Sequence, residues 1–198
     1  MRGDAFVLGQ DVDELARFVG VDPARDKLPP AELIVRIGIV LAAAARYVQQ
    51  VPPHTLAKPL PGRDRTGLDL AYHIGVIPLA LLDAVRGGSI TYAHFERRAP
   101  DGADAATVAA FIREVAAELA AWWPEARGHP PSIDTYYGRQ PFHGVLERTA
   151  WHAAQHTRQL MALVIANGAP PDGPLRAEDL AGLPLPAEVY DDQVTLAG

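Results

Sequence analysis

Four long segments of this chain repeat apolar residues at every third or fourth position, and stretches rich in proline and glycine separate them. In the first segment Leu33, Ile37 and Val40 follow this spacing, which places side chains along one face of a helix rather than one face of a strand. The pattern predicts four helices, over residues 31–51, 66–85, 103–123 and 141–166. The expected fold class is therefore all-α.

The lengths of these helices and of the segments between them favour an up-down four-helix bundle, although links of this length also allow other orders of packing. With 48% apolar residues, the 198-residue chain has enough material for one core. We expect a single domain, in which residues 30–168 form the bundle and residues 169–198 a packed tail. Residues 1–29 would add a small appendage, with a strand at "AFVLG" followed by a turn and a helix.

The overall charge and the absence of cysteine exclude several functions. The net charge is −6, and no run of lysine and arginine marks a basic surface, so a nucleic acid is not an expected partner. The chain has no cysteine, which excludes disulfides, cysteine zinc sites and cysteine nucleophiles within it. Any thiol chemistry would therefore use a bound small molecule.

The chain shows no pattern that directs it to a membrane or out of the cell. Its first residues, "MRGDAFVLGQ", do not have the charged and apolar regions of a signal peptide. The most apolar windows, such as "HIGVIPLALLDAV", are too short or too interrupted to span a bilayer. We therefore expect a soluble cytoplasmic protein.

Three of the seven histidines interrupt the apolar stripes of the predicted helices. His152 and His156 lie one turn apart on the stripe of the last helix, and His73 lies on the stripe of the second. Burying an imidazole costs free energy unless its nitrogens are bound. A divalent metal ion between facing helices would bind all three at once. The alternative is a set of core histidines with separate hydrogen bonds, since an HxxxH spacing alone often arises by chance.

The residues around the histidines restrict the kind of metal site. "HAAQH" lacks the glutamate of the HExxH motif, so the general base of that metalloprotease class is absent. Three histidine ligands with open coordination positions are typical of a catalytic site. Zinc is the favoured ion, and nickel, cobalt and iron also accept imidazole. Asp69, one turn before His73, is a candidate to hold that ring through a hydrogen bond.

The other four histidines are not expected at this site. His54, His94 and His129 fall in the links between helices, where histidines are usually exposed and uninvolved. His143 precedes His152 by nine residues, which places it on the opposite face of the helix. None of the four should share a metal ion with the pair.

Polar residues near the pair are further candidates. Arg148 lies one turn before His152 and could bind a carboxylate of a thiol cofactor; the alternative is an exposed or helix-paired arginine. Tyr136 and Tyr137 lie in the segment predicted as a loop before the last helix, where they could cover the end of the bundle or simply pack against it. No residue stands out as a general acid or base.

The segments "LDLAYHIGVIPLAL" and "VLERTAWHAAQHTRQL" resemble the DinB superfamily of four-helix metalloproteins. The resemblance covers residues 30–168, and its most specific part is one histidine in the second helix together with an HxxxH pair in the last. His73, His152 and His156 occupy these positions. The resemblance implies that these three residues bind a metal ion.

Known relatives in this superfamily include S-transferases that use glutathione, mycothiol or bacillithiol, and a thiol-dependent maleylpyruvate isomerase. The resemblance therefore implies a metal-dependent enzyme that activates a low-molecular-weight thiol for transfer to, or isomerisation of, a small electrophile. It also suggests a homodimer. The N-terminal "GDAFVLGQDVDELARFVG" is similar to the closing strand, turn and helix of a glutaredoxin, which favours glutathione as the thiol.

Two other functions stay open at this point. A metal-dependent hydrolase would use metal-bound water as its nucleophile, and its activity would not need an added thiol. A non-enzymatic binding or stress-response module would use the metal for stability alone and would leave no coordination position open.

Overall fold

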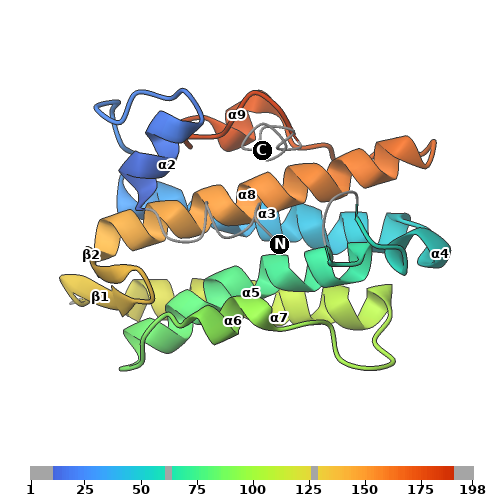
Figure 1. Cartoon of the computed structure of the whole chain (residues 1–198), viewed down its shortest axis with the longest axis horizontal. Coiled ribbons are helices and arrows are strands. Elements are labelled where there is room, and N and C mark those ends of the chain that lie inside the picture. Colours follow the sequence, from blue (N-terminus) through green and yellow to red (C-terminus); the bar gives the residue numbers. More distant parts are fainter. Residues whose placement is uncertain (1–10, 61–63, 126–128, 190–198) are drawn as a thin grey trace.

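Four long helices dominate the structure, a computed structural model that describes residues 11–60, 64–125 and 129–189 (Figure 1). They are α3 (Pro30–Gln50), α5 (Gly67–Val85), α7 (Ala105–Glu125) and α8 (Phe142–Ala166). Their bounds agree to within two residues with the predicted helices. Within the described ranges the strands form one two-stranded sheet, so the expectation of a largely all-α fold is confirmed.

A side-chain cap sets the start of α5, and a glycine follows the end of α8. At the start of α5 the Thr66 hydroxyl accepts from the backbone N–H of Asp69 at 3.1 Å, and the Asp69 carboxylate accepts from the N–H of Thr66 at 3.1 Å. This reciprocal pair satisfies two N–H groups that have no partner within the helix. α8 ends at Asn167 and Gly168, whose φ of 79° is the left-handed conformation that glycine favours.

The helices α5 and α7 run in the same direction. In the first half of each helix the Tyr72 and Phe111 rings stack with centroids 4.6 Å apart, and further along the Arg86 guanidinium lies 3.2 Å from the Glu118 carboxylate. Contacts that advance together along both helices require parallel axes. The segment after α5 makes this possible, because it folds back along α5 and includes the short helix α6 (Tyr92–Glu96) before α7 begins (Figure 1).

The helices α3 and α8 are likewise parallel to each other. At their starts the His143 ring lies 2.9 Å from the carbonyl oxygen of Leu28, and beyond their ends the Thr55 and Asn167 side chains are 2.9 Å apart. α3 and α5 each pack along both α7 and α8 rather than mainly against each other. The up-down order favoured from the sequence is therefore wrong, and one of the other orders left open by the long links is present, because the return of the chain after α5 lets α7 start at the same end as α5.

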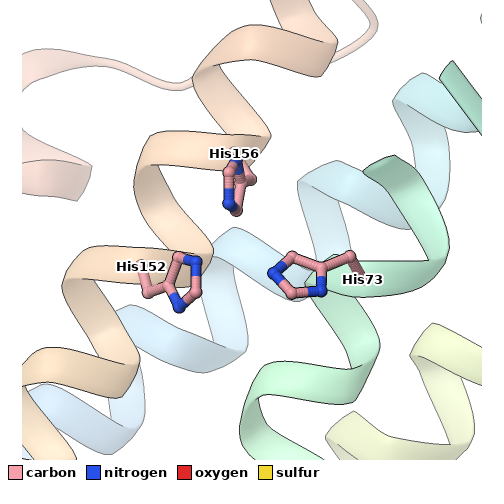
Figure 2. A group of neighbouring side chains, drawn as sticks. All are labelled: His73, His152 and His156. Carbon is pink, nitrogen blue, oxygen red and sulfur yellow. The ribbon is translucent and has the colours of Figure 1, made fainter. Parts of the chain in front are cut away.

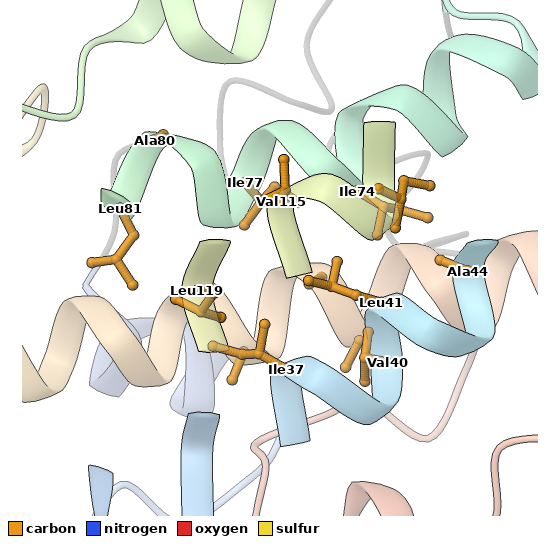
Figure 3. Close-up of a cluster of buried hydrophobic side chains, with 14 of the residues drawn as sticks. Ile37, Val40, Leu41, Ala44, Ile74, Ile77, Ala80, Leu81, Val115 and Leu119 are labelled. Atoms are coloured by element: carbon orange, nitrogen blue, oxygen red, sulfur yellow. The ribbon is translucent and has the colours of Figure 1, made fainter. Parts of the chain in front are cut away.

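The core between the long helices consists of aliphatic side chains. Figure 3 shows Ile37 and Leu41 of α3 near Ile74 and Ile77 of α5 and Leu119 of α7. All five are at most 2% exposed. Burying side chains of this size stabilises the fold by about 1.5–3 kcal/mol each. The predicted apolar stripes are thus the faces along which the helices pack.

The segment predicted as a loop before the last helix contains a hairpin. β1 (Ser132–Thr135) pairs antiparallel with β2 (Gly138–Pro141), and Tyr136 and Tyr137 form the turn between them. The prediction of a plain loop was wrong because each strand has four residues, and in β1 only Ile133 is buried. Strands this short do not show a recognisable alternation of apolar and polar residues.

The remaining described elements are short helices. α2 (Val12–Phe18) confirms the helix predicted in the N-terminal appendage, and it packs against α8. The strand predicted at "AFVLG" lies outside the described residues. α4 (Pro53–Leu56) follows α3, and α9 (Ala177–Leu180) packs the tail against α3.

By length and composition α5 is apolar enough to cross a membrane, which differs from the expectation for this segment. However, 67% of its most apolar window is buried inside the protein. A core helix has the same properties, so this feature is weak evidence for a membrane span.

Candidate metal centre

Three histidines from two facing helices meet in the interior of the protein. His73 points from α5 toward His152 and His156, which project from consecutive turns of α8 (Figure 2). Each residue offers one ring nitrogen, and these atoms lie within 4.8 Å of one another. The ring centroids are 5.2 Å apart from His73 to either partner and 4.7 Å apart within the pair. The triad is therefore close enough to hold one metal ion.

Burial favours the neutral form of these imidazoles. The exposed fractions are 3% for His73, 7% for His152 and 8% for His156. Desolvation lowers the pKa of His152 well below its usual value, and the neighbouring His156 and His73 lower that pKa further. A neutral imidazole keeps a lone pair on one nitrogen, as a metal ligand must.

The hydrogen bonding of His152 tests whether a metal ion fits this triad. Its Nδ1 atom is buried and has no hydrogen-bond partner among the described residues. Buried polar atoms nearly always have a partner, because leaving one unsatisfied costs free energy. The alternative of core histidines that each have their own hydrogen bonds therefore gives this nitrogen no partner among the described residues. A donor set of three neutral imidazoles does fit a divalent metal ion.

His156 is held in one tautomer by a residue that sequence reasoning did not single out. Its Nδ1 lies 2.8 Å from Oε1 of Gln159, whose Nε2 donates to the carbonyl oxygen of Val189 at 3.2 Å. Because the amide nitrogen engages a carbonyl, the amide oxygen faces the ring and the ring Nδ1 must donate. The lone pair of His156 is then on Nε2, where it can bind a metal. The position of Gln159 three residues after His156 was the available signal.

Asp69 anchors a neighbouring segment. Its carboxylate accepts from the N–H of Ala99 at 3.1 Å, in addition to its contacts with Thr66, and lies 3.6 Å from the Arg98 guanidinium. Burial raises the pKa of Asp69, but the hydrogen bonds and the positive charge outweigh that effect, so its pKa is lowered. The ionised carboxylate thus holds the segment that folds back along α5 and carries α6. Its expected contact with the ring of His73 stays a prediction.

Phe95 of α6 covers the triad, and no pattern in the sequence predicts this position. Its ring centroid lies 5.7 Å from that of His73 and 5.8 Å from those of His152 and Tyr136. Phe95 is 4% exposed, and it reaches the histidines only because the chain returns along α5. An apolar wall of this kind excludes water and strengthens electrostatic interactions inside the site.

Arg148 is buried beside the triad, with 5% exposure, rather than exposed on the helix. Its Nη2 donates to the Tyr136 hydroxyl at 3.2 Å, and its guanidinium carbon lies 4.7 Å from the centre of the Tyr137 ring. After burial and the other two histidines, its positive charge is a further cause of the lowered pKa of His152. Burial raises the pKa of both tyrosines, so their hydroxyls stay protonated at neutral pH. The hairpin turn thus adjoins the site.

The other four histidines lie outside the triad. The ring of His143 lies 2.9 Å from a backbone carbonyl just before α3, which confirms that it does not join the triad. His54 and His129 are exposed, as predicted. His94 is less exposed than predicted: its side chain is 11% exposed and its Nε2 lies 3.4 Å from the Asp83 carboxylate. This contact ties the returning segment to α5.

The chemistry open to this arrangement follows from its ligands. Three neutral imidazoles leave coordination positions for a further molecule, as in catalytic metal sites, where the ion acts as a Lewis acid. A scan against models of protein families and a search of curated proteins found no match for this chain. Its function is therefore inferred from the triad and from the sequence motif that contains it.

Proposed function

We propose that this protein is a divalent-metal-dependent enzyme of the DinB type, which activates a low-molecular-weight thiol for transfer to, or isomerisation of, a small electrophile. Glutathione is the leading thiol and zinc the leading metal. The observation that carries the proposal is the convergence of His73, His152 and His156, whose ligand atoms lie within 4.8 Å of one another. The four long helices would then be the four-helix bundle of that superfamily.

The composition of the chain supports a nucleophile taken from a small molecule. The protein has no cysteine, and the HxxxH pair lacks the glutamate that serves as a base in HExxH enzymes. A divalent cation at the triad would act as a Lewis acid and lower the pKa of a thiol bound there. In a transfer, the sulfur forms a bond to the electrophilic carbon, and the thiol proton leaves with the displaced group. No oxidant or reductant is needed.

Arg148 would bind a carboxylate of the thiol. Arg148 lies one turn of α8 before His152. Its guanidinium is oriented by the Tyr136 hydroxyl at 3.2 Å and by the Tyr137 ring. A guanidinium matches a carboxylate through two parallel hydrogen bonds, and glutathione carries two carboxylates. Phe95, whose ring lies against those of His73 and His152, would exclude water from the reacting sulfur.

Cobalt(II)-loaded protein should bind glutathione through its sulfur. We expect an intense near-ultraviolet sulfur-to-cobalt charge-transfer band on addition of glutathione, and no such band with S-methylglutathione, whose sulfur is blocked. The zinc-loaded protein should then consume a small electrophile only when a thiol is present. Ester hydrolysis without any thiol would favour the hydrolase instead. Full metal occupancy with neither thiol binding nor turnover would favour the non-enzymatic module.

Replacing Arg148 by methionine should raise the dissociation constant for glutathione about 10- to 100-fold, because a charge-assisted hydrogen bond in a buried site is lost. The dissociation constant for 2-mercaptoethanol, which has no carboxylate, should not change. Both constants are read from the charge-transfer band of the cobalt protein. Arg113→Met, which removes an exposed charge on α7, is the matched control and should change neither. An equal loss for both thiols would contradict a role in carboxylate binding.

A further inference from the structure

The C-terminal strap, residues 186–189, lies against the helix that supplies two of the histidines. Arg158 of α8 donates to the first two carbonyl oxygens of the strap at 2.8 and 3.0 Å. Gln155 and Gln159 both donate to its last carbonyl oxygen, that of Val189, at 2.8 and 3.2 Å. Three side chains from two turns of α8 thus hold the strap by its backbone.

The two glutamines are buried, and each follows a histidine of the triad by three residues. Gln155 is 4% exposed and Gln159 is 1% exposed, so both ends of each amide need a partner. The oxygen of Gln155 accepts from the Arg158 guanidinium at 2.9 Å. The oxygen of Gln159 instead accepts from Nδ1 of His156 at 2.8 Å. Only one of the two strap contacts is therefore connected to a metal ligand.

Gln159 is a single planar group between the strap and His156. Its nitrogen contacts the Val189 carbonyl and its oxygen contacts the ring, so the docked strap favours the orientation in which the amide oxygen faces His156. If the strap left, the amide could turn and present its NH₂ group to the ring. The ring would then accept at Nδ1 and carry its proton on Nε2, which would remove the lone pair from Nε2.

We propose that Gln159 is a positioning residue that couples docking of the strap to metal binding by His156. The inference rests on the metal centre of the proposed function and adds a means of controlling it. With the strap docked, His156 keeps its proton on Nδ1 and its lone pair on Nε2. Because coupling between two binding events is reciprocal, a bound metal should stabilise the docked strap as much as the docked strap strengthens metal binding.

Gln159→Leu and Gln155→Leu form a matched pair for the test. Both remove a donor to Val189, and the contact with His156 belongs to Gln159. Zinc affinity, measured by competition with a chromogenic chelator, should fall about 10- to 100-fold in Gln159→Leu, as for other residues that orient a metal ligand. The loss of zinc affinity in Gln155→Leu should be clearly smaller. Gln159→Glu keeps an acceptor for the ring and should restore most of the affinity.

The tautomer of His156 gives a readout that does not depend on metal. Nitrogen-15 NMR of the metal-free protein should show the proton on Nδ1 in the wild type and in Gln155→Leu. In Gln159→Leu the proton should move at least partly to Nε2. A proton on Nε2 in the wild type would overturn the positioning role.

The reciprocal effect is measured on the strap itself. Glu188 is exposed, so a glutamate-specific protease can cut after it once the strap lifts away from α8. Zinc should slow this cut in the wild type and in Gln155→Leu but not in Gln159→Leu. Cleavage after Glu178, which is exposed on α9, should not respond to zinc in any of the three proteins.

The outcomes separate this inference from the function on which it rests. Equal zinc affinity in the wild type and Gln159→Leu would overturn the coupling and leave the metal centre intact. A wild type that binds no zinc would overturn the metal centre and the coupling together. Melting curves of the metal-free proteins show whether a variant has simply failed to fold, and in that case Gln159→Glu decides the question.

Discussion

Replacement of His152 by alanine is expected to reduce bound zinc from about one ion per chain to background, because zinc needs all three histidine ligands to stay bound at the triad. His73→Ala should do the same although it changes a different helix, since ligands from α5 and α8 hold the same ion. Elemental mass spectrometry of untagged protein, purified under zinc-replete conditions, measures this loss directly.

His143→Ala is the matched control for the triad variants. This histidine is also on α8, but its ring contacts the carbonyl oxygen of Leu28 at 2.9 Å, so the variant should keep its zinc. Chelation should lower the melting temperature of the wild type and of His143→Ala, because a ligand of the folded state stabilises it, and should leave His152→Ala unchanged. A wild type without zinc would mean that the histidines are core residues, and it would also contradict the proposed metal-dependent activity.

Replacement of Arg25 by methionine is expected to lower the free energy of unfolding by about 3–5 kcal/mol, the cost of breaking a buried ion pair. Arg25 lies between α2 and α3, and its Nη2 donates to Oε1 of Glu147 on α8. The side chains are 14% and 0% exposed, respectively. The variant would leave the Glu147 carboxylate buried without this cation, and the segment that carries α2 would lose a polar anchor on α8.

Two controls separate the buried pair from surface charge. Lys27 lies in the same segment, 2.7 Å from Asp13, but the two side chains are 32% and 37% exposed, so Lys27→Met should cost less than about 1 kcal/mol. The double variant Arg25→Met/Glu147→Leu should recover most of the loss, because it removes both buried charges. Urea denaturation followed by circular dichroism measures all four proteins. A loss below about 1 kcal/mol in Arg25→Met would contradict an anchoring role.

Local patterns in the sequence were sufficient to predict the long helices and the side chains that face inward. The 3.6-residue period assigns a side chain to one face of its helix whatever the helix packs against. It therefore placed His73, His152 and His156 on buried stripes, and it separated His143 from them. The histidine positions of the candidate site could be predicted for the same reason.

Features that depend on contacts between distant residues could not be predicted. The parallel course of α5 and α7 requires the chain to return along α5, where Asp69 accepts from the N–H of Ala99. That return also brings Phe95 over the histidines. The alternative for Arg148 was an exposed or helix-paired side chain, yet it is buried and donates to the Tyr136 hydroxyl of the hairpin turn. No local sequence pattern predicts any of these contacts.

His156 separates what the sequence determines from what the tertiary structure determines. Its place on the stripe of α8 was determined by the sequence alone, because neighbours one turn apart share a face in any helix. Its proton position depends on Gln159, whose amide is oriented by the carbonyl of Val189, 30 residues further along the chain. The sequence by itself determined which residues can become ligands. The tertiary structure decided how close they lie and which nitrogen His156 presents, because distance and hydrogen-bond direction arise only when separate segments pack together.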